Sequence, residues 1–185
     1  MITAESIRQA LDADSRSGAL ISDDGIYRYL LWRSFWPPPG TAPLGFVCLN
    51  PSKAGAVEDD PSIRRMLGYA YREGASGIIV GNVTPIRATD PGELPARFAR
   101  GYDHDPAPNR LALEELASRC PVVVVAWGAT FGRANWRQIR VAEAMKRIAE
   151  ADALAVCLGT TKEGHPRHPL YVRGDQPLIP WEAAR

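Results

Sequence analysis

Two polar loops of this chain combine residue types that can carry out chemistry. The first loop, residues 50–60, opens with Asn-Pro-Ser directly after an apolar run and ends with Asp59 and Asp60. The second loop, residues 159–170, carries His165 and His168, each followed by a proline. An amide can hold a water or a base edge, a carboxylate can act as a general base, and an imidazole can donate to a departing oxygen. We expect the two loops to form opposite walls of one site.

Further polar and aromatic residues stand where other apolar runs end. Asn82 lies at the end of one run, and Trp127 closes another just before Gly128. An indole ring can stack on a planar ligand, and the glycine beside it permits close approach. The other candidate binding residues carry hydroxyl, guanidinium, ammonium or imidazole groups suited to phosphate and base contacts: Ser52, Arg64, Arg87, Lys162, Arg167 and His168.

The two adjacent carboxylates predict different roles. Asp60 stands directly before Pro61, the pattern of a helix N-cap followed by proline in the first turn. Asp59 is then surplus to capping, so it is a candidate general base or cation stabiliser. These carboxylates would repel an anion at the helix start, and no Walker or Gly-x-Gly-x-x-Gly pattern follows a strand.

The elements that must position these residues follow from the apolar pattern. Segments of helical pattern alternate with four buried runs, at residues 44–49, 77–83, 122–127 and 153–158. This alternation predicts a parallel sheet with helices on both faces, whose C-terminal edge collects the ligand loops. An Asp-Asp-Gly turn within residues 19–32 favours a hairpin at one edge. We expect one α/β domain over residues 1–185, a three-layer α/β/α sandwich with a central, mainly parallel four-stranded sheet.

Composition narrows the class of protein. The chain has 185 residues, 45% hydrophobic and 23% charged, as in ordinary globular domains, and its net charge of +1 does not announce nucleic-acid binding. No apolar run approaches the ~20 residues that span a bilayer, and the start lacks a signal-peptide pattern, so we expect a cytoplasmic protein without a membrane partner. The three cysteines and three histidines show no metal-site or disulfide spacing, so we expect buried thiols, no metal and no cofactor.

Several motifs in a fixed order resemble an uncharacterised family, domain of unknown function 1643. The motifs are Arg28-Tyr29-Leu30, Leu49-Asn-Pro-Ser52, Asp59-Asp-Pro-Ser-Ile-Arg64, Asn82, Arg87-Ala-Thr-Asp-Pro91, Trp127-Gly128 and Gly164-His-Pro-Arg-His-Pro-Leu170. The resemblance covers most of the chain. It implies a bacterial or phage protein and brings no established activity.

A second, more distant similarity concerns the uracil-DNA glycosylase superfamily. Asn50-Pro51 resembles the loop that holds the attacking water there, and His165-Pro166, with 168–170, resembles the loop whose histidine faces the base carbonyl. Trp127-Gly128 also has a counterpart after an intervening apolar strand. The similarity implies a compact α/β/α fold with a short parallel sheet.

These features predict a protein that acts on a nucleobase or nucleotide, with a glycosylase-like hydrolase of the N-glycosidic bond as the leading hypothesis. The transition state resembles an oxocarbenium ion and needs a carboxylate or a positioned water, for which Asn50 and Asp59 are the candidates. The departing base gains negative charge and needs a donor, for which His165, assisted by Lys162, is the candidate. We therefore expect one cleft lined by Asn50, Asp59, Asn82, Trp127 and His165.

Two alternatives remain open at this point. The same pocket could belong to a non-catalytic module that binds a nucleotide or a modified base. Asp59 and Asp60 could instead hold Mg²⁺ in a nucleotide-processing enzyme. The identity of the base, the strand form of a nucleic-acid partner and the oligomeric state do not follow from the sequence.

Overall fold

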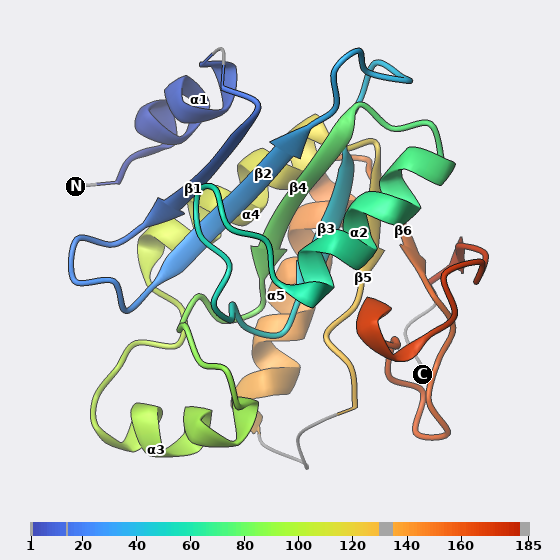
Figure 1. Ribbon diagram of the computed structural model, residues 1–185. Helices are drawn as coiled ribbons and strands as arrows, with labels where there is room; N and C mark the ends of the chain where they lie inside the picture. The colour runs from blue at the N-terminus through green and yellow to red at the C-terminus, as the bar shows by residue number, and fades with distance from the viewer. Residues whose placement is uncertain (1, 14, 130–134, 182–185) are drawn as a thin grey trace.

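The protein, described by a computed structural model over residues 2–13, 15–129 and 135–181, is built around one mixed sheet (Figure 1). Its strand order is β1-β2-β4-β3-β5-β6-β7. The strands are β1 (Ser17–Ile21), β2 (Arg28–Ser34), β3 (Leu44–Cys48), β4 (Gly77–Asn82), β5 (Val122–Val125), β6 (Leu154–Cys157) and β7 (Ile179–Pro180). The α/β class expected from the sequence is confirmed.

The sheet has seven strands, where the sequence predicts four central strands and a hairpin at one edge. β3 pairs in parallel with both β4 and β5, and β5 pairs in parallel with β6. The N-terminal hairpin extends this sheet, because β2 pairs antiparallel with β4 and β1 with β2. At the other edge β7 adds a short antiparallel pairing through Ile179 and Pro180. β7 has only two residues, which is too short a run to show the alternating hydrophobic pattern of a strand, so the sequence does not predict it.

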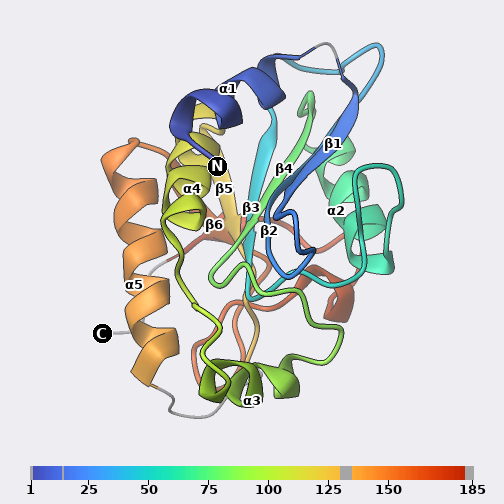
Figure 2. The ribbon, with the colours of Figure 1, turned by 90° about the vertical axis from the view of Figure 1, so that its left-hand side faces the viewer.

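Helices cover both faces of the sheet, as Figure 2 shows edge-on. α2 (Pro61–Arg72) lies on one face, and α1 (Ala4–Asp12), α4 (Ala107–Arg119) and α5 (Asn135–Glu150) lie on the other. Two buried apolar clusters match these layers. Ile63 and Met66 of α2 belong to one cluster, whereas Ile7 of α1 and Leu116 of α4 belong to the second. None of the helices in the described residues is long and apolar enough to cross a bilayer.

The start of α2 is fixed by local chemistry. The Asp60 side chain accepts a hydrogen bond from the Ile63 amide at 2.9 Å, and Pro61 occupies the first turn. Gly74 follows the helix with φ of 70°, a backbone conformation that side chains disfavour. The predicted cap and first turn are confirmed. α2 therefore begins at the sheet edge where β3 ends.

The long segment between β4 and α4 contains the short helices η1 (Pro91–Glu93) and α3 (Leu94–Ala99). Its first part is bound to the loop after β3, because the Thr84 amide donates to Leu49 O and the Ala88 amide donates to Pro51 O, both at 2.9 Å. The two loops that follow β3 and β4 are thus joined through their backbones.

Candidate functional site

A cavity of about 910 Å³ opens where the parallel strands end at their carboxyl edge. Its walls come from the loops after β3, β4, β5 and β6 and from the first turns of α2. Seven of the predicted site residues line it: Asn50, Ser52, Asn82, Trp127, Lys162, Arg167 and His168. The two polar loops singled out in the sequence do form walls of one cavity.

Arg28, at the start of β2, is a lining residue that was not predicted as part of the site. It is only 3% exposed, and one guanidinium nitrogen donates to Ala54 O at 2.9 Å. Its Nε is buried with no hydrogen-bond partner, and no ion pair holds it among the described residues. Burial lowers the pKa of Arg28 to about 10, and the Asp60 carboxylate opposes that shift. The sequence signal that could have identified Arg28 is a charged residue at the start of a mainly apolar strand.

His168 and Asp60 lie in the same lining. Burial lowers the pKa of His168 to about 4, while the negative charge of Asp60 acts in the opposite direction. The ring Nδ1 accepts a hydrogen bond from the Leu170 amide at 3.2 Å, which places the proton of the neutral ring on Nε2. His168 is therefore a neutral hydrogen-bond donor at pH 7 beside a carboxylate.

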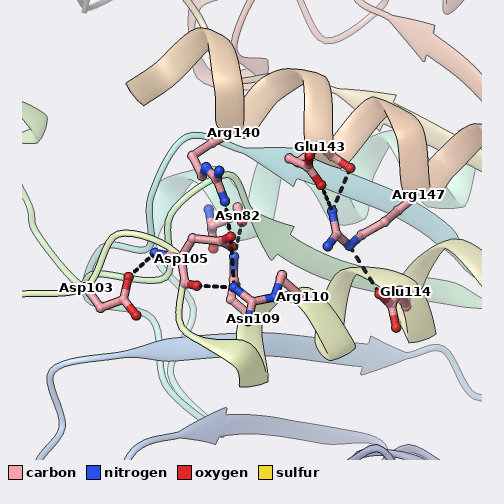
Figure 3. A network of polar contacts seen from close by, with 9 residues as sticks. All are labelled: Asn82, Asp103, Asp105, Asn109, Arg110, Glu114, Arg140, Glu143 and Arg147. Carbon is pink, nitrogen blue, oxygen red and sulfur yellow. Dashed lines mark hydrogen bonds and ion pairs between the residues drawn. The ribbon is translucent and has the colours of Figure 1, made fainter. Parts of the chain in front are cut away.

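Asn82 brings an amide group to the cavity from the end of β4. The side chain is 1% exposed, and its Oδ1 has no hydrogen-bond partner. The Asn82 backbone is held from behind, because Asn109 of α4 donates to its carbonyl at 3.2 Å (Figure 3). In the same view Asp105 pairs with Arg110 and with Arg140, which joins the entry to α4 to α5.

Aromatic rings border the cavity. Trp127 is almost fully buried and packs edge-on against Trp181, with ring centroids 5.9 Å apart. Gly128, with φ of 72°, follows Trp127, and its amide donates to Pro166 O at 2.9 Å, which ties the loop after β6 to the end of β5. Tyr171, by contrast, is 78% exposed and offers its ring to solvent at the cavity.

Asp59 lies outside the lining of the cavity. Its carboxylate accepts from Arg33 Nε at 2.9 Å. The same guanidinium donates to four backbone carbonyls, those of Gly18, Trp32, Gly55 and Glu58. Asp59 therefore serves to hold the loop after β3, and the expectation that it faces the cleft was wrong.

His165 is also absent from the lining, although it lies three residues before His168. Its amide and carbonyl form a turn with Thr161, the carbonyl accepting from the Thr161 amide at 2.8 Å. Burial lowers the pKa of His165, and Arg137 adds to that effect. Lys162 and Arg167 of this loop line the cavity, so the expectation of one cleft holds for the loop and not for its first histidine.

The remaining predicted residues are engaged with the backbone. The Asn50 amide nitrogen donates to Pro51 O at 3.0 Å and to Ala88 O at 2.8 Å, so this side chain fastens two loops while lining the cavity. Arg64 donates to Asp59 O at 2.6 Å, and Arg87 donates to Gly25 O at 3.2 Å. Neither arginine lines the cavity.

The thiols and carboxylates bear on other chemistries. Cys48, Cys120 and Cys157 are buried and unpaired, and burial raises the pKa of Cys48, which lines the cavity, to about 12. Within the described ranges no group of three or more His, Cys, Asp or Glu side chains gathers. Asp59 and Asp60 have separate partners, Arg33 and the Ile63 amide, so the two carboxylates do not act as one pair.

Comparison with known proteins gives one match. A family model described as a protein of unknown function (DUF1643) matches residues 28–170. No curated protein and no solved structure matches the chain. The similarity to the uracil-DNA glycosylase superfamily therefore stays a prediction.

Proposed function

The chain belongs to the DUF1643 family of proteins of unknown function, and from its cavity we propose that it binds a nucleotide or a modified nucleobase compound and hydrolyses its N-glycosidic bond. The observation that carries the proposal is Arg28, a guanidinium buried in the cavity wall without a carboxylate partner. A buried cation is costly unless it is paired and fully hydrogen-bonded. A phosphate of the ligand supplies both the charge and the acceptors.

The other lining groups suit a planar polar ring. Trp127 and Tyr171 supply aromatic surface, and Ile63, Met66 and Leu170 supply apolar area. The unpartnered Oδ1 of Asn82 is an acceptor for an N–H of the ring edge. A ring held by apolar and aromatic walls, with an anion at one end, matches the outline of a nucleotide.

Asp60 and His168 take the roles that the sequence suggested for Asp59 and His165. The Asp60 carboxylate can orient a water or stabilise an oxocarbenium ion at the sugar. The neutral His168 ring, with its proton on Nε2, can donate to the oxygen of a departing base as negative charge develops there. This pair lines the cavity together, which is the reason for preferring it.

The two histidines provide a matched test. Base release would be measured from nucleoside monophosphates and from base-modified oligonucleotides, using wild type, His168→Ala and His165→Ala. Loss of one donor to a developing anion lowers turnover on the order of 10²-fold, and we expect that loss in His168→Ala alone. Equal rates for the two variants would contradict the assignment, as would absence of base release by the wild type.

A non-catalytic binding module is the second candidate function. It is favoured by the engagement of the polar groups near the sugar position, because Asn50 donates to two carbonyls and Asp60 caps α2. Calorimetric titration with the same compounds separates the two functions. Binding that depends on Arg28 without any base release would support the module.

A further inference from the structure

A second groove runs beside the cavity, between α2 and residues 170–174. Its volume is about 460 Å³, and it shares Pro61 and Leu170 with the cavity lining, so the two hollows are adjacent. We propose that this groove holds additional phosphate groups of the ligand whose base occupies the cavity. The inference rests on the proposed function and extends it, since it makes the substrate a polyphosphate nucleotide or a nucleotide within a strand.

The charge of the groove supports a phosphate ligand. Arg64 and Arg65 line it, and no acidic residue does so among the described residues. No hydrogen bond or ion pair engages the Arg65 guanidinium within the described part of the chain. Four carboxylates lie near the groove along the chain, and each has a partner: Asp59 pairs with Arg33, Asp60 accepts from the Ile63 amide, Glu73 pairs with Arg72, and Asp175 pairs with Arg173. The groove therefore presents two guanidinium groups and no lining carboxylate among the described residues, with Asp60 lying at its Pro61 end.

The far wall of the groove is held in place by α2 itself. The Tyr69 hydroxyl donates to Arg173 O, and Arg72 donates to Gly174 O at 2.8 Å and to Gln176 O at 2.9 Å. These bonds fasten residues 173–176 alongside the helix. The groove is thus formed before any ligand arrives, which lowers the entropic cost of binding.

A glycine in the middle of α2 is the second, independent observation. Gly68 is exposed, lines the groove, and has empty space where a Cβ would stand, with nothing within 4 Å. Alanine stabilises a helix interior better than glycine does, so neither packing nor helix formation calls for glycine here. A ligand that lies close against the helix backbone does call for it.

The dimensions fit one or two phosphate groups. From Pro61 to Gly68 the helix rises seven residues, which is about 10 Å at 1.5 Å per residue. Phosphates in this groove can come from a di- or triphosphate chain or from the next nucleotide of a strand. Both sources offer the same charged oxygens to Arg65, and the experiment distinguishes them by ligand.

The test compares ligands that share one base. Affinities would be measured for the nucleoside monophosphate, the triphosphate and a trinucleotide, with wild type, Arg65→Ala and Gly68→Ala. Arg8→Ala serves as the charge-matched control, because Arg8 lies on α1, whose helix covers the opposite face of the sheet. For wild type we expect the triphosphate or the trinucleotide to bind about tenfold tighter than the monophosphate.

In Arg65→Ala that advantage should fall to about twofold or less while monophosphate affinity is kept, and Arg8→Ala should match wild type. Gly68→Ala should raise the melting temperature and still weaken the longer ligands. Equal affinities for all three ligands in wild type would overturn this inference and leave the cavity proposal standing. Failure of the monophosphate to bind would overturn both, and a Gly68→Ala variant with undiminished affinity would contradict the open groove floor.

Discussion

The two ends of β2 treat a buried arginine in opposite ways. Arg33, near the end of the strand, is 7% exposed and bonds to one carboxylate and four carbonyls. Arg28, at its start, is 3% exposed and bonds to a single carbonyl, with Nε left unpartnered. Both guanidinium groups reach the loop after β3. The protein itself supplies the hydrogen-bond partners of Arg33, whereas Arg28 keeps hydrogen-bonding capacity for a ligand.

This difference separates stability from function within one strand. Substituting a buried charged residue that has all its partners in place is strongly destabilising, because the partner group is left uncompensated. A buried charge with few partners contributes little to the fold and becomes fully satisfied when an anion binds. The following expectations test that division, from the largest effect to the smallest.

Arg33→Met should produce the largest loss of stability. The substitution leaves the partly buried Asp59 carboxylate and several carbonyls without their donor, so we expect the free energy of unfolding to fall by about 3–5 kcal/mol. Urea denaturation followed by circular dichroism measures this. A loss below about 1 kcal/mol would mean that Arg33 is no more structural than Arg28.

Lowering the pH should reduce the free energy of unfolding through His168, which lines the same cavity as Arg28. The folded-state pKa is about 4 and the ordinary value is 6.5, so the unfolded chain takes up the proton first. Unfolding free energy should therefore fall as the pH drops from 6.5 to 4, by about 3 kcal/mol in total from this group. His168→Asn keeps an acceptor for the Leu170 amide and should flatten that part of the stability profile. If His168→Asn kept the wild-type pH profile of stability, another titrating group would be responsible for the pH dependence.

Arg28→Met should reverse the pattern of Arg33→Met. We expect stability within about 1 kcal/mol of wild type, because a poorly satisfied buried charge is replaced by an apolar chain. Affinity for a nucleoside monophosphate should fall about 10²-fold, or roughly 2.7 kcal/mol, since a buried charged contact to the ligand is lost. Calorimetric titration and urea denaturation of the same sample give both numbers. A large loss of stability with unchanged affinity would make Arg28 a second structural arginine.

The adjacent carboxylates provide the finest comparison. Asp59→Asn weakens the Arg33 ion pair and should cost about 1–2 kcal/mol of unfolding free energy. Asp60→Asn should change stability by less than about 0.5 kcal/mol, because Asn caps a helix about as well as Asp. Base release should nevertheless be lost in Asp60→Asn and kept in Asp59→Asn. If Asp60→Asn lost more unfolding free energy than Asp59→Asn, Asp60 and not Asp59 would be the structural carboxylate.

Much of the fold could be predicted because it depends on short-range patterns. The four apolar runs each contain one strand, and Asp60 with Pro61 marks the start of α2. These features need only neighbouring residues to be recognised. The hairpin could be expected at an edge of the sheet, but its partner strand could not be predicted, because the pairing of β2 with β4 joins segments far apart in the chain.

The site was predicted at the level of loops and not of single residues. The loops after β3 and β6 do meet, but the predicted catalytic residues Asp59 and His165 lie outside the lining, which holds Asp60 and the predicted binding residue His168. In each case the deciding contact is distant or geometric. Arg33 stands 26 residues before its partner Asp59, and no local pattern announces that bond. Arg28 was not predicted as a site residue, because only the structure shows that its guanidinium is buried with few hydrogen-bond partners.

The contacts of Arg33 also set how this protein can change over evolution. Apart from Asp59, everything that Arg33 touches in the loop after β3 is backbone carbonyl, at Gly55 and Glu58. A loop held by its backbone keeps its course whichever side chains it carries. Mutations at exposed positions such as Val57 can therefore accumulate without disturbing the wall of the cavity, whereas insertions that shift the carbonyls cannot. Contacts of this kind tolerate substitutions in the loop after β3 but not changes in the length of that loop.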